Sequence, residues 1–230
     1  MRIAFLISSA TLMLTLGSPA FANGGGAMHP APPPGQLPPR EATPAQRATA
    51  LYNDALHLTK KADRAQETAT AATDAGKKDK AAHEANDEYT AAHAKFEQAT
   101  QIDPAMPEAW NYLGYTSRKL GRYQDALAAY DKALSLKPSY ADALEYRGEA
   151  YLAVNHVPDA KQAYLDLYAS NRALAEKLLN AMKAWVTAQR AAPGGASAGV
   201  EDFDHWIQER VQISAQTASL TRAGTAASWR

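Results

Sequence analysis

The chain lacks cysteine and has no excess of charge of either sign. None of its 230 residues is Cys, which excludes disulfides and thiolate chemistry. It carries 24 Lys and Arg residues against 24 Asp and Glu residues. The charge excess of a nucleic-acid-binding protein is therefore missing, and we expect no nucleic acid as a partner.

Two sequence motifs of catalysis are also missing, since there is no Gly-rich phosphate loop and no HExxH motif. Two pairs, His83 with Asp87 and His93 with Glu97, are four residues apart and could each supply part of a zinc site on one helix face. Such pairs are common on exposed helices. We therefore predict no catalytic residue, no metal and no cofactor, and hence no enzyme; a metal-binding or hydrolytic protein is the third alternative below.

The first 22 residues have the features of a cleaved signal peptide. Arg2 precedes an apolar stretch over residues 3–16, which is short for a membrane span, and Ala20-Phe21-Ala22 forms a small-x-small cleavage site. We expect cleavage after Ala22 and a periplasmic or secreted mature chain without an integral membrane span. Export without cysteine favours a bacterial periplasm. An uncleaved N-terminal anchor is the alternative.

Residues 23–43 are rich in glycine and proline. Proline at this density favours extended polyproline II and leaves little to bury in a core. We predict a linker that holds the following domain away from its exit point; a ligand for a proline-binding groove is the alternative.

The middle of the chain is periodic. One fixed step relates Ala92, Ala126 and Ala160, and it also relates Phe96, Tyr130 and Tyr164. Pro104 and Pro138 are separated by the same step. A fixed period of about 34 residues indicates stacked supersecondary units, which usually present a surface to another macromolecule.

The segment from Pro107 to Tyr140 resembles a tetratricopeptide repeat (TPR). The matching positions are Trp110, Leu113, Gly114, Ala126, Tyr130, Ala133 and Pro138, with Ser117 as the departure, where a large residue is usual. The next repeat, over residues 141–172, supplies Leu144, Gly148, Tyr151, Ala160 and Tyr164; Arg147 replaces the usual Leu, and Arg172 stands where Pro is expected. The resemblance implies an all-α fold, a short TPR solenoid of helical hairpins.

Several of these residues have structural roles. Gly114 and Gly148 are expected where two antiparallel helices approach closely. Gly121 is expected to end the first helix of its repeat, and Pro158 suits the first turn of a helix.

The first repeat, over residues 44–106, is much longer than the others. Its stretch from Leu51 to Ala92 corresponds to the short stretch from Leu113 to Ala126 in the next repeat. The added residues, which we call the insertion, are rich in helix formers and have one break near Asp74. We therefore predict an elongated hairpin with helices over about 44–72 and 78–102. Small residues would let its two arms pack closely; they are Ala62, Ala65, Ala69, Ala81, Ala85 and Ala92. The hairpin would serve as a docking arm or as a long terminal cap.

Further helices follow the repeats. Leu174, Leu178, Met182 and Trp185 share one face of a predicted capping helix over residues 173–192. A Gly/Pro linker over 193–199 leads to an amphipathic helix over 200–214 with Phe203, Trp206 and Ile207, which we expect to fold back on the array. Residues 215–230 are predicted to be a frayed tail.

The resemblance also implies a binding face, because the first helices of TPR hairpins line a concave groove. The candidate partner-binding residues are Asn53, Asn111, Tyr115, Arg118, Lys119, Glu145 and Glu149. Thr49, His57 and Asp142 occupy further groove positions, and solvated polar faces are the alternative reading. Asp142 has the wrong sign at a position where carboxylate-clamping TPR arrays carry Lys, so a C-terminal peptide of the Hsp type is not expected.

Three hypotheses follow. The first is a non-enzymatic adaptor of the cell envelope that binds a protein or peptide in the groove. The second is a structural protein that self-associates through the long hairpin or the C-terminal helix. The third is the metal-binding or hydrolytic protein named above.

Overall fold

The computed structural model describes residues 41–193 and 197–227. The chain divides into two units, Met1–Glu41 and Ala42–Arg230, and the following concerns the second unit. The predicted signal peptide and almost all of the predicted linker over residues 23–43 lie outside the described residues.

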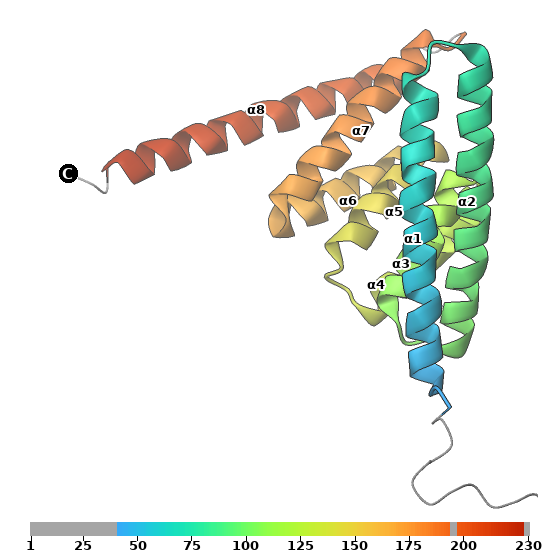
Figure 1. The fold of residues 1–230 in the computed structure, drawn as a ribbon. Coiled ribbons are helices and arrows are strands. Elements are labelled where there is room, and N and C mark those ends of the chain that lie inside the picture. Colours follow the sequence, from blue (N-terminus) through green and yellow to red (C-terminus); the bar gives the residue numbers. More distant parts are fainter. Residues whose placement is uncertain (1–40, 194–196, 228–230) are drawn as a thin grey trace, which may run out of the picture. The chain divides into compact units, whose positions relative to one another are not determined.

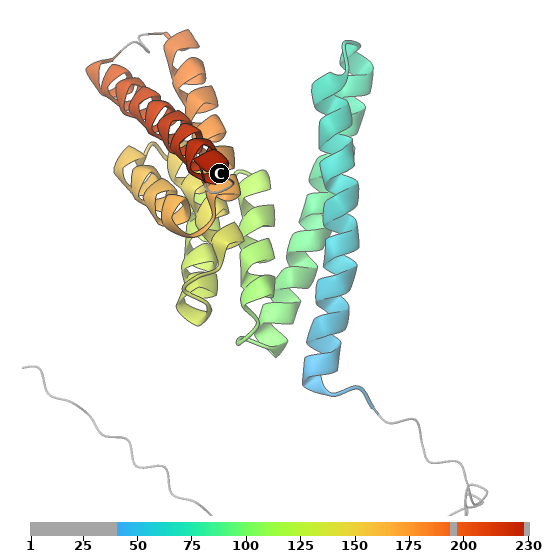
Figure 2. The ribbon, with the colours of Figure 1, turned by 90° about the vertical axis from the view of Figure 1, so that its left-hand side faces the viewer.

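The described residues are all-α and form eight helices. Their bounds are α1 Pro44–Ala71, α2 Ala75–Ile102, α3 Pro107–Lys119, α4 Tyr123–Leu136, α5 Ala141–Ala153, α6 Val157–Ser170, α7 Arg172–Ala191 and α8 Ala198–Ala227. Helices α1 to α6 pair into three successive hairpins, and α7 packs on α5 and α6 (Figures 1 and 2). The first helices α3, α5 and α7 contact one another in turn, which gives the solenoid one face built from first helices.

The elongated first hairpin is present. Helices α1 and α2 have 28 residues each, against 13 or 14 in the helices of the later hairpins. Figure 2 shows their outer ends extending past α3. Helix α2 begins at Ala75, three residues before the predicted start, because the side chain of Asp74 caps it by accepting a 2.8 Å hydrogen bond from the backbone N–H of Lys77.

Alanine lines the seam between the two long helices. All six small residues predicted to lie there are buried. Ala48, Ala55, Ala62 and Ala69 on α1 recur at a heptad spacing, and all four are buried. A heptad repeat keeps one narrow stripe of a helix facing its neighbour, so the hairpin packs through methyl groups along most of its length.

The close approach predicted at two glycines is confirmed. A Cβ atom at Gly114 would lie 2.6 Å from the ring of Tyr130, and one at Gly148 would lie 2.6 Å from Leu178. Gly121 has a positive φ of 75° just after α3, as a helix-terminating glycine requires. Asn155, one repeat later, has a φ of 60° at the same point after α5. The repeat therefore keeps its turn geometry where its sequence changes.

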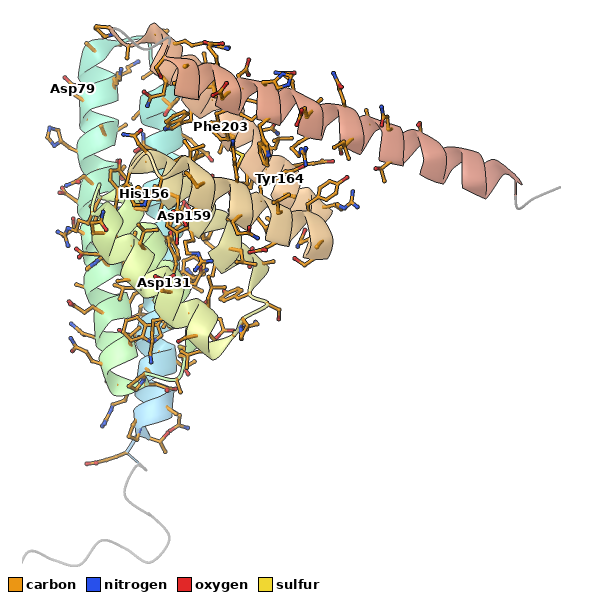
Figure 3. The ribbon with its side chains drawn as sticks, turned by 180° about the vertical axis from the view of Figure 1, so that it is seen from behind. Asp79, Asp131, His156, Asp159, Tyr164 and Phe203 are labelled. Carbon is orange, nitrogen blue, oxygen red and sulfur yellow. The ribbon has the colours of Figure 1, made fainter. Side chains whose placement is uncertain are left out.

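The C-terminal helix differs from the prediction. Helix α8 runs from Ala198 to Ala227, so the prediction of a frayed tail from residue 215 is wrong for the described residues. The stretch after Ser214 contains no proline and several alanines, and it can therefore continue a helix that has already been started. The first part of α8 folds back as expected, with Phe203 and Ile207 buried. Figure 3 shows Phe203 beside Tyr164 of α6, and the ring of Trp206 contacts both of their rings.

No helix in the described part of the chain combines the length and the apolar character that a membrane span needs.

Candidate partner-binding face

We use the term first-helix face for the surface formed by α1, α3, α5 and α7. The seven predicted residues of this face differ in their exposure to solvent. Asn53 and Lys119 are exposed, and Tyr115, Arg118 and Glu149 are partly buried. Asn111 and Glu145 are buried, with exposed fractions of 1% and 0%. Only five of the seven can therefore meet a partner directly in this structure.

Asp63 of α1 is the centre of a hydrogen-bond network on this face. Its Oδ1 atom accepts hydrogen bonds of 2.6 Å from the hydroxyl of Tyr89 on α2 and from the hydroxyl of Tyr115 on α3. Burial and this bonding raise the pKa of both tyrosines far above the usual value, so both remain donors. The network joins the elongated hairpin to the second hairpin and fixes the ring of Tyr115.

The sequence did not identify Asp63. It lies in the insertion that lengthens the first hairpin, and a standard repeat has no corresponding position. Only the predicted lengthening of α1 could have indicated that a polar residue from the added turns would reach α3.

Arg118 and Glu149 form an ion pair between α3 and α5. Arg118 Nη1 lies 2.8 Å from Glu149 Oε2, and both side chains are mostly buried. The Arg118 guanidinium also lies 5.5 Å from the ring centre of Tyr115 and 5.7 Å from that of Tyr146. Two of the predicted groove residues, which carry opposite charges, therefore pair with each other, and this positions both charges before any partner arrives.

Glu145 has an unusual environment for a carboxylate. One of its oxygens accepts a 2.9 Å hydrogen bond from Nζ of Lys177 on α7, while the other, buried, has no partner among the described residues. Burial, with a further contribution from nearby Glu149, raises the pKa of Glu145 to about 7. Glu145 thus holds the capping helix to α5 instead of facing a partner.

Four partly buried tyrosines form what we call the tyrosine row: Tyr52, Tyr112, Tyr115 and Tyr146. Successive ring centres lie 6.0, 6.1 and 5.0 Å apart, so the row crosses from α1 over α3 to α5. The buried ring of Phe96 stacks on the ring of Tyr112, and their ring centres are 5.4 Å apart. Burial raises the pKa of Tyr52 to about 12 and raises those of Tyr112 and Tyr146. All four hydroxyls are therefore protonated at neutral pH.

The family model of the tetratricopeptide repeat matches residues 107–140. These residues are α3 and α4 with the turns around them. Residues 107–140 are a tetratricopeptide repeat. The hairpin of α5 and α6 repeats its glycine, its buried aromatic residue and its turn at the corresponding positions.

One solved structure similar to this chain is described as the first TPR of Spaghetti (RPAP3) bound to the HSP90 peptide SRMEEVD. It is 18% identical, with a TM-score of 0.41, and the match covers 58% of this chain and 94% of that one. No curated protein matches the chain.

An open pocket lies where the tetratricopeptide repeat meets the elongated hairpin. It has a volume of about 480 Å³, and it is lined by Asp63, Gln66, Glu67, Thr70, Ala71, Tyr115 and Lys119. Lys119, which lines this pocket, lies 5.5 Å from the ring centre of Tyr115. Two predicted groove residues thus border a pocket whose other wall comes from the inserted turns of α1.

Ser117, the departure from the repeat pattern, is explained by a histidine. His93 Nε2 of α2 lies 3.1 Å from Ser117 Oγ, so a larger side chain at this position would meet the His93 ring. Burial lowers the pKa of His93, which favours the neutral ring that this contact suits. Ser117 is 1% exposed and lies inside α3.

The other histidine pair considered as part of a zinc site, His83 with Asp87, lies on the exposed side of α2. Within residues 41–193 and 197–227, no group of three or more metal-ligating side chains is close enough together to hold an ion.

Proposed function

We propose that this protein is a non-enzymatic adaptor that binds a polypeptide segment on its first-helix face. One observation carries the proposal: aromatic side chains from three hairpins converge in the tyrosine row, next to the ion pair of Arg118 and Glu149. Aromatic and Arg side chains are the types enriched at the energetic centres of protein interfaces. Their internal contacts fix their rotamers in advance, which lowers the entropy cost of binding.

Site-specific photo-crosslinking tests this assignment. A photoreactive phenylalanine analogue would replace Asn53 or Lys119, which are exposed on the first-helix face, and as a control Lys132, which is exposed on α4. We expect the first two positions to capture the same polypeptide from extracts of the source cells, and Lys132 not to capture it. Equal capture from all three positions, or capture from Lys132 alone, would show that the partner uses another surface.

We further propose that the protein works in the cell envelope. The support is the signal-peptide pattern of residues 1–22 with its cleavage site at Ala22. Fractionation of the source cells, followed by N-terminal sequencing of the purified protein, tests this. A periplasmic or secreted chain that begins at Asn23 is expected, whereas a cytoplasmic chain that begins at Met1 would refute it.

Self-association through α8 is a second candidate, and one observation favours it. Ile213 of α8 is a large apolar residue that is 39% exposed, and Figure 1 shows the C-terminal part of α8 extending away from the other helices. Light scattering on the mature chain and on the Ile213→Glu variant distinguishes the two. A dimer that the variant converts to a monomer would support this candidate, and a monomeric mature chain would exclude it.

A further inference from the structure

The tyrosine row has more hydrogen-bonding capacity than the fold uses. The hydroxyl of Tyr115 is bonded to Asp63, but those of Tyr52, Tyr112 and Tyr146 have no hydrogen-bond partner among the described residues. All three side chains are partly exposed. The first-helix face therefore presents a strip of aromatic rings with three free donors.

Charged side chains of both signs border the row. Asp142 on α5 is exposed and has no ion-pair partner in the described part of the chain, and its charge contributes to raising the pKa of Tyr112 and Tyr146. Lys119 lies 5.5 Å from the ring centre of Tyr115, and Lys177 lies 4.9 Å from that of Tyr146. An occupant that carries a basic residue would be favoured near Asp142.

The chemistry of the strip distinguishes between kinds of polypeptide. A helical segment has already used its backbone carbonyls and could accept few bonds from the tyrosine hydroxyls. A polyproline II segment has no internal hydrogen bonds, so its carbonyls are free to accept, and its proline rings pack on aromatic side chains. At about 3.1 Å per residue, five or six residues would cover a row no longer than about 17 Å.

We propose that the tyrosine row binds a proline-rich, extended segment of a partner protein, with a basic residue of that segment next to Asp142. The proposal rests on the proposed function, because it specifies which polypeptide the first-helix face takes. Proline rings would lie between the tyrosines, and the hydroxyls of Tyr52, Tyr112 and Tyr146 would donate to the segment's carbonyls.

The test uses fluorescein-labelled peptides and the mature chain, with binding measured by fluorescence anisotropy. The probe is hexaproline followed by arginine. The comparison peptides are an equally long Gly/Ser peptide ending in arginine, and hexaproline followed by glutamate. We expect the Gly/Ser peptide to bind at least tenfold more weakly, because it lacks rings and loses more entropy, and the glutamate peptide to bind several-fold more weakly. Equal affinity for all three would overturn the proposal.

Two variants assign the binding to the row. Tyr112→Phe with Tyr146→Phe keeps both rings and removes two donors, so we expect at least a fivefold loss of affinity with an unchanged helical signal. Tyr123→Phe on α4, where the tyrosine is 36% exposed, is the matched control and should leave affinity unchanged. Asp142→Asn should remove the preference for arginine over glutamate. Unchanged binding in the double Phe variant would place the peptide elsewhere and refute the assignment.

The outcome for the proline-rich peptide can be separated from that of the proposed function. If photo-crosslinking at Asn53 and Lys119 captures a partner and the proline-rich probe does not compete with it, the adaptor function stands and the proline-rich inference is wrong. If neither crosslinking nor any peptide engages the face, both are wrong.

Discussion

The hydroxyl of Tyr115 on α3 donates a 2.6 Å hydrogen bond to Oδ1 of Asp63 on α1. The same carboxylate oxygen accepts from Tyr89 on α2, so one anionic group joins three helices of two hairpins. Asp63 belongs to the turns that distinguish the first hairpin from a standard repeat. The insertion therefore contributes to the candidate binding face as well as lengthening the hairpin.

Replacing Asp63 should loosen the joint between the first two hairpins. Asp63→Ala removes two hydrogen bonds to a charged group and leaves the buried hydroxyl of Tyr89 without its acceptor. We expect a loss of about 2 to 4 kcal/mol in the free energy of unfolding, measured by urea denaturation. Glu67→Ala, one turn further along α1 at an exposed position, is the control and should change stability by less than about 0.5 kcal/mol. A loss below about 1 kcal/mol for Asp63→Ala would show that the network contributes little.

The two interhelical glycines should tolerate no side chain. In Gly114→Ala the new methyl group would have to displace the ring of Tyr130, and in Gly148→Ala it would have to displace Leu178. We expect each variant to lose about 1 to 3 kcal/mol of stability, as overpacking in a core does. Gly199→Ala is the control, because nothing lies within 4 Å of its added methyl group; it should be neutral or slightly stabilising. Thermal unfolding that ranks all three variants equally would contradict this account.

The sequence predicted the periodic part of the fold well. The repeat period located the hairpins, the insertion indicated two long helices, and the pattern of small residues identified the alanine seam. Local capping shifted one boundary, because Asp74 starts α2 earlier than the turn-like composition suggested. The continuation of α8 to Ala227 was missed because polar, alanine-rich sequence is compatible with both helix and coil, and no local signal ends the helix.

The candidate site was less predictable, and the reason is tertiary. Repeat positions identified Tyr115, Arg118 and Glu149 on one face, but they could not show that Arg118 and Glu149 pair with each other. The burial of Glu145 depends on α7, which brings Lys177 to it. Contacts made across hairpins are decided by how the repeats stack, and position within one repeat does not contain that information.

Stability should depend on pH through Glu145. Its pKa is raised from 4.5 to about 7 in the folded chain, so the folded state holds this proton more tightly than the unfolded state. Between these pH values, raising the pH removes the proton from the folded state, and the free energy of unfolding falls by up to about 3 kcal/mol. Glu145→Gln cannot titrate. We therefore expect the wild type to lose stability relative to this variant as the pH rises from 4.5 to about 8.

Urea denaturation at several pH values measures this difference. Glu176→Gln on α7 changes an exposed carboxylate and is the control; it should follow the wild type across the range. A difference between the wild type and Glu145→Gln that stays constant with pH would mean that Glu145 keeps an ordinary pKa in the folded chain.

His93 and Ser117 should prove energetically coupled, since Nε2 of His93 lies 3.1 Å from Oγ of Ser117. Ser117→Ala deprives the partly buried His93 ring of the partner at 3.1 Å, which should cost about 1 to 2 kcal/mol. In a double-mutant cycle with His93→Ala, removing both side chains should cost less than the sum of the single losses, because the second replacement leaves no unsatisfied ring nitrogen. Ser135→Ala, an exposed serine that bonds only within its own helix, is the control and should change little. Strict additivity of the two single variants would mean that the contact contributes nothing, and the small residue at this repeat position would then need another cause.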